Sequence, residues 1–175
     1  MTVVVDASVV VAALVDAGPA GTWAEVLLQS EPLAAPHLMP VEAANIVRRA
    51  AIAGDISTDV AALAHMDLTT LPVELFPYEP FAPRVWELHR NLTAYDAWYV
   101  SLAEALGARL ATLDGKLRRS PGPRCRFLAP ATRTSRRPKT HFGYCKQKKK
   151  VRQPGTKEVL VCEKISPTKT LVHTR

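Results

Sequence analysis

Short runs of apolar, mostly β-branched residues alternate with helical patterns through the first 130 residues of the chain. The runs are too short for helices of their own and predict buried strands of a parallel sheet. They span Thr2–Val5, Leu33–Ala35, Val73–Phe76, Arg109–Leu113 and Arg126–Leu128. Helices are predicted between them, at Ser8–Val15, Thr22–Leu28, Pro40–Ala53, Ser57–Leu68, Pro80–Leu92 and Thr93–Leu106. This alternation predicts an α/β fold in which helices cover both faces of the sheet.

Local signals set the ends of several of these helices. Thr22 and Glu25 have the spacing of a capping box, as do Thr93 and Asp96, and Ser57 is a candidate cap for the helix that it begins. Gly54 and Gly107 stand where a glycine commonly ends a helix. The helix that Gly107 ends is the most regular, with large apolar residues at helical spacing: Tyr95, Trp98, Tyr99, Leu102 and Leu106. We interpret its aromatic residues as core or dimer contacts rather than as platforms for nucleobases.

Charge divides the chain near Pro130. Residues 1–130 hold 10 Lys/Arg and 14 Asp/Glu, whereas residues 131–175 hold 13 Lys/Arg and 2 Asp/Glu. The second segment has few large apolar residues, so burial does not offset its chain entropy. We expect one domain over 1–130 and a disordered basic tail over 131–175, with one weak hairpin of 158–162 and 170–173. The tail's charge attracts RNA phosphates without sequence preference, but a solvated tail or a read-through extension is the simpler interpretation.

Composition excludes several classes of protein. The three cysteines include none before Cys125, which gives no disulfide framework and fits a reducing compartment. The longest apolar stretch, Val3–Val15, contains Asp6 and is too short to cross a bilayer. No basic segment precedes it, as a secretory signal requires. We therefore expect a cytoplasmic protein that makes no membrane contact.

Four acidic residues stand at the ends of predicted strands or in the first turns of predicted helices. Asp6 and Asp114 directly follow strands, and Glu42 and Asp96 lie in first turns. Ligands of parallel sheets bind at the carboxyl ends of the strands, so these carboxylates are expected to converge there. Each acid taken singly has a structural explanation, as a cap, a dipole partner or a turn residue. Their common edge favours a shared site.

Such a site predicts metal-dependent chemistry. Neighbouring carboxylates repel one another unless cations compensate, and oxygen ligands suit Mg²⁺ or Mn²⁺. One or two ions held in this way fit phosphodiester hydrolysis. A phosphatase with Asp6 as its nucleophile is an alternative, which Ser8 disfavours because a second acid is expected at that place. A second alternative is a non-catalytic nucleic-acid-binding protein whose domain is a scaffold and whose tail binds.

Four stretches of sequence carry a family resemblance, in the expected order and at the expected distances: Val3–Ser8, Pro36–Arg49, Asn91–Leu106 and Leu110–Asp114. Together they resemble the PIN-domain family, in its VapC-type toxin branch, over residues 1–130. The resemblance implies a three-layer α/β/α domain with a five-stranded parallel sheet. It also implies Mg²⁺-dependent endoribonuclease activity and a VapB-type antitoxin that occupies the acidic groove.

The resemblance also implies roles for the acids. By their positions in the motifs, Asp6 and Asp96 resemble the principal ligands of Mg²⁺, for which Mn²⁺ is a substitute. Glu42 and Asp114 resemble the remaining acids, which bind metal directly or through water and orient the attacking water.

Three further residues resemble supporting positions of the family. Ser8 and Thr112 match hydroxyls that bond the acids or the substrate phosphate, although bonds to local backbone explain them equally well. Asn45, one turn after Glu42, either supports that acid or faces solvent. We expect an RNA substrate, a cognate VapB-type antitoxin and a homodimer. The tail of residues 131–175 has no counterpart in such toxins.

Overall fold

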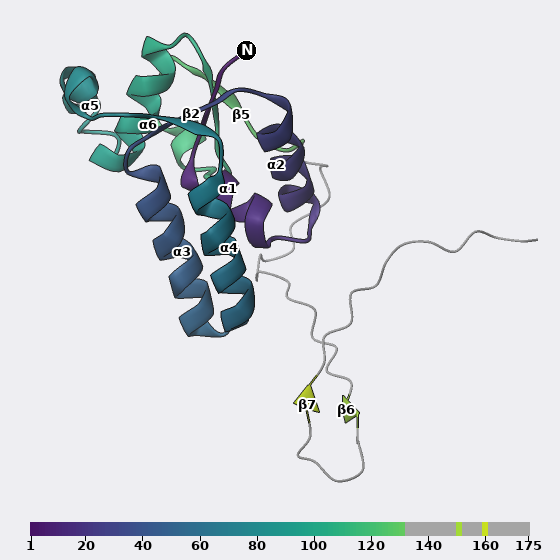
Figure 1. Cartoon of the computed structure of the whole chain (residues 1–175). Coiled ribbons are helices and arrows are strands. Elements are labelled where there is room, and N and C mark those ends of the chain that lie inside the picture. The colour runs from purple at the N-terminus through teal and green to yellow at the C-terminus, as the bar shows by residue number, and fades with distance from the viewer. Residues whose placement is uncertain (132–149, 152–158, 161–175) are drawn as a thin grey trace, which may run out of the picture. The chain divides into compact units, whose positions relative to one another are not determined.

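A parallel sheet of five strands runs through the first unit of the chain (Figure 1). The computed structural model describes residues 1–131, 150–151 and 159–160, and the chain separates into two units, Met1–Ser135 and Arg136–Arg175. The strand order is β3-β2-β1-β4-β5. The strands are β1 (Val3–Val5), β2 (Leu33–Pro36), β3 (Val73–Phe76), β4 (Arg109–Ala111) and β5 (Arg126–Leu128). All five predicted strands are present, with ends shifted by two residues at most.

The central strand β1 explains why the sequence forms this sheet. Its three valines are fully buried, as expected where helices cover both faces. Val4 pairs with Ala34 of β2 on one side and with Leu110 of β4 on the other. Because the strands are parallel, the residues that follow β1 and β4 leave the sheet at the same edge.

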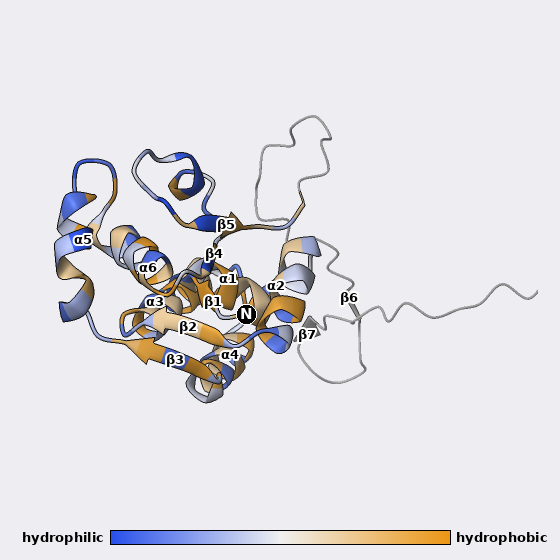
Figure 2. Cartoon of the chain, turned by 90° about the horizontal axis from the view of Figure 1, so that it is seen from above, coloured by the Kyte–Doolittle hydropathy of each residue, from blue (hydrophilic) through white to orange (hydrophobic). Residues whose placement is uncertain are grey.

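Two groups of helices enclose the sheet. The α-helices are α1 (Ala7–Val15), α2 (Pro19–Ser30), α3 (Met39–Ala53), α4 (Thr58–Thr70), α5 (Ala82–Glu87) and α6 (Ala94–Ala105). Short 3₁₀ turns form η1 (Glu79–Phe81) and η2 (Leu117–Arg119). Helix α1 packs on α2, α3 and α4, whereas α6 packs on α5 and crosses β1, β2 and β4. Figure 2 shows α5 and α6 on one side of the strands and α2 on the other, which confirms the predicted three-layer α/β/α fold.

Several predicted helix ends are confirmed by their hydrogen bonds. The Ser57 side chain caps α4 by accepting from the amide of Val60 at 3.2 Å. Gly54 follows α3 at a φ of 75°, a left-handed conformation that favours glycine. Gly107 follows α6 at a φ of 58°. Helices α3 and α4 extend side by side away from the sheet (Figure 1).

Two predicted helices were wrong in extent. The helix expected from the capping box at Thr22 begins earlier, because Pro19 occupies its first position and Thr22 instead donates its hydroxyl to the carbonyl of Gly18 at 3.2 Å. The single helix expected over 80–92 is divided into η1 and the short α5. Pro83 lies in the first turn of α5, where its missing N–H costs nothing. The apolar pattern is the same for both arrangements, so it did not distinguish them.

The second unit contributes two short strands. β6 (Lys150–Val151) pairs antiparallel with β7 (Val159–Leu160). The predicted hairpin contained β7 but assigned it a different partner, residues 170–173, which lie outside the described part of the chain, as does most of the predicted tail. The observed register places Val151 opposite Val159.

Among the described residues, one pair of helices together has the length and composition of a membrane-spanning segment. No single one of these helices is long and apolar enough to cross a membrane, and only α1 and α2 together, bent by 109°, pass by length and composition.

Candidate functional site

Asp6 is the most constrained carboxylate of the predicted site. It follows β1 directly, caps α1, and is only 9% exposed. One carboxylate oxygen, Oδ1, accepts from the amide of Ser8 at 3.1 Å. The other, Oδ2, accepts from the Ser8 hydroxyl at 3.0 Å and from the Thr112 hydroxyl. Three donors from two elements therefore fix the orientation of this carboxylate.

The same hydroxyls tie the ends of β1 and β4 together. Ser8 Oγ accepts from the amide of Leu113 at 3.1 Å, and Thr112 Oγ1 accepts from the amide of Asp114 at 3.0 Å. Each hydroxyl therefore bonds the Asp6 carboxylate and one backbone amide, which is local in the sequence for Thr112 but distant for Ser8. These bonds also explain why β4 ends at Ala111, before its predicted end. Asp114 itself is exposed, and its Oδ1 accepts from the amide of Lys116 at 2.6 Å.

Glu42 is held by Tyr99, an aromatic residue that was predicted to form core or dimer contacts. The Tyr99 hydroxyl on α6 donates to Glu42 Oε2 on α3 at 3.0 Å. Tyr99 is 2% exposed, so its ring is core as predicted, while its hydroxyl supports the site. Burial, followed by the negative charges of Glu42 and Asp6, raises the pKa of Tyr99, which therefore remains a hydrogen-bond donor at neutral pH.

Asp96 lies in the first turn of α6, and Thr93 is its partner. Thr93 caps the helix by accepting from the amide of Asp96 at 3.1 Å, and its hydroxyl donates to Asp96 Oδ2 at 2.8 Å. The predicted cap is therefore present, and it orients the acid as well. Thr93 is a supporting residue that the sequence analysis treated only as part of a cap.

Asn45 forms no hydrogen bond with Glu42 within the described residues. It is exposed on α3, and its Oδ1 accepts from Arg48 Nε at 3.2 Å. Of the two possibilities that the sequence left open for Asn45, the structure shows the solvent-facing one.

The pKa values indicate that the four acids are electrostatic neighbours. Burial raises the pKa of Glu42, and the charges of Asp6 and Asp96 raise it further, against the Tyr99 hydrogen bond and Arg49. Burial likewise raises the pKa of Asp96, to which the charges of Asp6 and Asp114 add, against the Thr93 hydrogen bond. The carboxylates of Asp6, Glu42, Asp96 and Asp114 thus lie near enough at the carboxyl edge for their charges to affect one another.

The chemistry of this donor set fits a hard divalent cation. All four acids offer oxygen, and within the described residues none of them forms an ion pair. No group of three acidic, histidine or cysteine side chains in the described part of the chain is already arranged to hold one ion. The four acids therefore suit a divalent cation by their charge and by their oxygen ligands. A bound cation would relieve the repulsion between them.

Comparison with known proteins gives the class of this domain. The chain belongs to the PIN-domain family, because residues 3–122 match the PIN domain. Within that family it is homologous to the VapC ribonucleases. It is 39% identical over 126 residues to ribonuclease VapC1 of Mycobacterium tuberculosis, covering 70% of this chain and 92% of that protein. The predicted membership in the VapC branch is confirmed.

Solved structures agree with the fold. The toxin VapC20 of Mycobacterium tuberculosis, which cleaves the sarcin–ricin loop, aligns with a TM-score of 0.51 at 17% identity, covering 66% of this chain and 92% of that one. VapBC2 of Rickettsia felis, bound to a DNA fragment from its promoter, aligns with a TM-score of 0.51 at 16% identity, covering 73% of this chain and 98% of that one. At these identities the likeness extends to the fold alone.

Proposed function

We propose that this chain is the toxin of a type II toxin–antitoxin system and hydrolyses RNA phosphodiester bonds with Mg²⁺ held by Asp6, Glu42, Asp96 and Asp114. The observation that carries the proposal is the placement of these carboxylates at one edge of the sheet, where Asp6 and Asp114 follow β1 and β4, and Glu42 and Asp96 lie in the first turns of α3 and α6. Repelling acids cost stability in the free protein, and a bound cation offsets that cost. Homology to VapC ribonucleases supports RNA as the substrate class.

The residues around the acids have distinct tasks in this mechanism. Mg²⁺, with Mn²⁺ as a substitute, would activate water and offset charge on the attacked phosphate. Ser8 and Thr112 keep the Asp6 carboxylate in one orientation through their hydroxyls. Tyr99 does the same for Glu42, and this matters because a rotating ligand loses affinity for metal. Asp114 is exposed, so its carboxylate is accessible from solvent.

Asp96→Asn tests the catalytic part of the proposal. Asparagine keeps an oxygen that can accept from the Thr93 hydroxyl but removes a metal-binding charge, so Mg²⁺-dependent RNA cleavage should fall by about 100-fold or more. The matched control is Asp67→Asn, because Asp67 is exposed on α4 and is not one of the four acids of the site. Cleavage is followed on labelled RNA with Mg²⁺, with Mn²⁺ and with EDTA. Unchanged cleavage by Asp96→Asn, or RNA binding in EDTA without cleavage in Mg²⁺, would favour the non-catalytic alternative.

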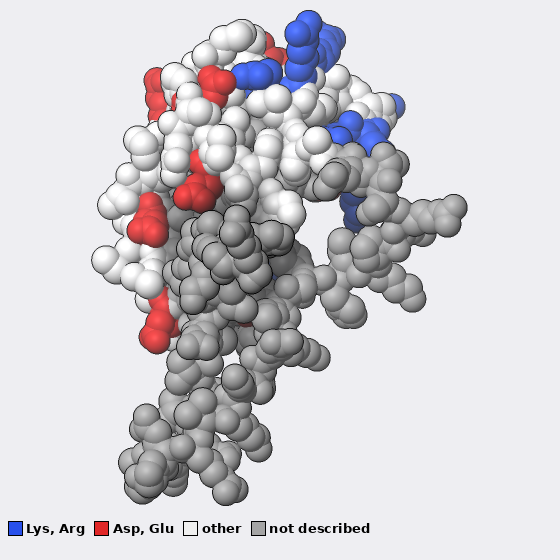
Figure 3. Space-filling model, turned by 90° about the vertical axis from the view of Figure 1, so that its right-hand side faces the viewer, with Lys and Arg blue, Asp and Glu red and all other residues white. Residues whose placement is uncertain are grey.

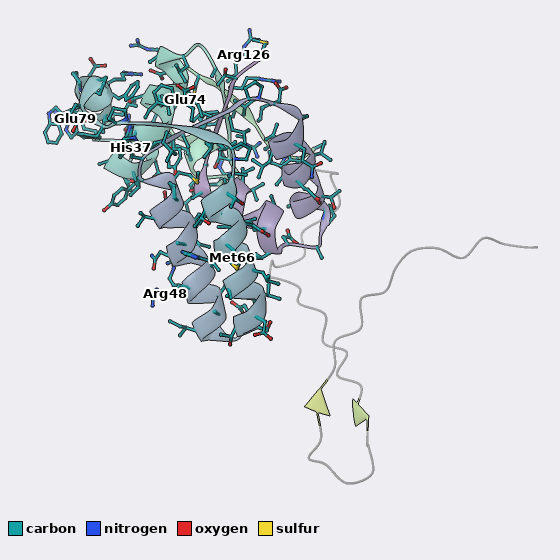
Figure 4. The ribbon with its side chains drawn as sticks, in the orientation of Figure 1. His37, Arg48, Met66, Glu74, Glu79 and Arg126 are labelled. Carbon is teal, nitrogen blue, oxygen red and sulfur yellow. The ribbon has the colours of Figure 1, made fainter. Side chains whose placement is uncertain are left out.

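The proposed partners are a cognate VapB-type antitoxin and a second copy of the chain, in the cytoplasm. Several large apolar side chains are more than 60% exposed on α3 and α4, namely Val41, Ile52, Leu63 and Met66, the last of which Figure 4 labels. Patches of this kind mark protein interfaces. Co-expression with the adjacent small reading frame should relieve toxicity and yield a complex on purification. A toxic, monomeric protein that no neighbouring product binds would contradict this part.

A further inference from the structure

A cavity of about 610 Å³ opens at the end of the sheet opposite the acids. Its lining includes Arg109 and Arg126, the first residues of β4 and β5, which pair with each other in the sheet. The acids follow the last residues of β1 and β4. Because all five strands are parallel, the cavity and the acids are separated along β4 by about 10 Å or more.

Positive charge dominates the cavity. Arg109, Arg124 and Arg126 line it, together with one acid, Glu104. The charge of Glu104 is already engaged, because its Oε2 accepts from Arg84 Nε at 2.8 Å and its Oε1 from the amide of Arg124 at 2.6 Å. On the face that Figure 3 draws, Lys and Arg gather at the top and on the right, whereas Asp and Glu lie mostly on the left and also reach the top. Figure 4 places Arg126 at that top end.

The arginines that line the cavity have guanidinium N–H groups that are available for further hydrogen bonds. Arg109 Nη2 donates to Glu31 at 3.1 Å, but Arg109 Nε is buried and has no hydrogen-bond partner within the described residues. A buried donor without an acceptor is costly, so an acceptor at this place would stabilise the protein. Arg124 and Arg126 are exposed, and no acid of the described residues pairs with them.

We propose that this cavity binds a phosphate-bearing ligand of about the size of a nucleotide. Guanidinium groups donate in a planar fork that matches phosphate oxygens. The volume of about 610 Å³ lies in the range of small-ligand sites, about 300–1,000 Å³. The phosphate accepts from Arg109, Arg124 and Arg126, and the apolar lining, which includes Ala103 and Ala108, receives the remainder of the ligand. A free nucleotide and a segment of an RNA strand share this chemistry. The site does not depend on the proposed nuclease activity.

Calorimetric titration of the full chain in EDTA tests the proposal, since EDTA removes divalent metal from the acids. The probes are inorganic phosphate, uridine 5′-monophosphate, uridine and a single-stranded RNA oligonucleotide. The test variant is Arg124→Gln/Arg126→Gln. The matched control, Arg48→Gln/Arg90→Gln, removes the same charge from exposed arginines outside the cavity, one of them on α3 (Figure 4). All of these chains carry the same basic tail, so its contribution cancels.

The monophosphate and phosphate should bind the unaltered chain and the control alike, whereas uridine should not bind. The test variant should bind the monophosphate at least about tenfold more weakly, as expected for loss of charged hydrogen bonds. Binding of the oligonucleotide but not of the monophosphate, lost in the test variant alone, would assign the site to an RNA strand. Absence of phosphate-dependent binding in the unaltered chain, or equal weakening in both variants, would overturn the proposal.

Discussion

The two ends of the sheet carry opposite charge on the same buried strands. At the carboxyl end, burial and like charges raise the pKa of Glu42 and Asp96. At the amino end, burial works to raise the pKa of Glu104, but the hydrogen bonds and charges of Arg84 and Arg124 outweigh it and lower that pKa. Glu42 and Asp96 therefore form no ion pair within the described residues, whereas Glu104 pairs with Arg84. The charge of Glu104 is stabilised in the free protein, and the charges of Glu42 and Asp96 are not.

The two ends should consequently respond to pH with opposite sign. A lowered pKa in the folded state means that Glu104 stabilises the fold above its ordinary pKa and loses this contribution as the pH falls through the lowered value. A raised pKa means that charged Glu42 and Asp96 cost stability at neutral pH. That cost is relieved as the pH falls through their raised values.

The largest effect should come from removing the most constrained acid. Asp6→Ala leaves the Ser8 amide and the hydroxyls of Ser8 and Thr112 without their acceptor, and it removes the cap of α1. The free energy of unfolding should fall by about 3 kcal/mol, measured by urea denaturation in EDTA. Asp67→Ala, on the exposed side of α4, should change it by less than about 0.5 kcal/mol. Equal effects of the two variants would show that the Asp6 bonds do not support the fold.

The second-largest loss of stability should come from a substitution at the amino end of the sheet. Arg84 donates to Glu104 and also to the carbonyl of Gly122 at 3.0 Å, so Arg84→Ala leaves a largely buried carboxylate without its main partner. We expect the free energy of unfolding to fall by about 2 kcal/mol at neutral pH. The loss should shrink in acid, once Glu104 is protonated. A loss that is constant with pH would assign the role of Arg84 to packing instead.

Asp96→Asn should raise the free energy of unfolding at neutral pH, whereas the two preceding substitutions lower it. Without metal, removal of one repelling charge should raise the free energy of unfolding by about 1 kcal/mol, as for other optimised charges. The gain should disappear as the pH falls through the raised pKa of Asp96. Added Mg²⁺ should stabilise the unaltered chain more than the variant, which thermal melts with and without the ion will measure. A variant that is destabilised in EDTA would contradict the contrast between the two ends.

The smallest effect concerns the tyrosine behind Glu42. Tyr99→Phe removes the hydrogen bond at 3.0 Å and should cost about 1 kcal/mol. The same bond opposes the rise in the pKa of Glu42, so the variant should lose its stabilisation by Mg²⁺ at a higher pH than the unaltered chain. Thermal melts across pH measure this shift, with Tyr78→Phe as the control. A purely structural tyrosine would lower stability without moving the pH dependence.

The sequence predicted what depends on neighbours in the chain. The strands, the caps at Ser57 and Thr93, and the placement of the acids after strands all follow from short patterns, and the parallel topology brings those acids to one edge. The predicted extents of α2 and α5 were wrong because a single proline, Pro19 or Pro83, lies at the start of each helix. The pattern of apolar residues around these prolines is the same with or without that start.

Contacts between distant segments were out of reach of these patterns. The hydrogen bond between Tyr99 and Glu42 joins residues 57 positions apart, and no local spacing in the sequence predicts it. The cavity was not predicted for another reason. The net charge of residues 1–130 is a single sum, and it does not show that arginines gather at one end of the sheet. Arg109, Arg124 and Arg126 gather at one end only once β4 and β5 have paired.

The pairing of β1 with β4 also has a consequence during protein synthesis. Val3–Val5 emerge from the ribosome before the other strands of the sheet, yet one of their two neighbouring strands is Arg109–Ala111. Thr112, which orients Asp6, and Asp114 follow that strand. Domains fold as their segments emerge, so the nascent chain lacks part of its acidic edge until more than a hundred residues have been translated. A ribosome making this protein therefore carries an incomplete site for most of the time that the domain takes to synthesise.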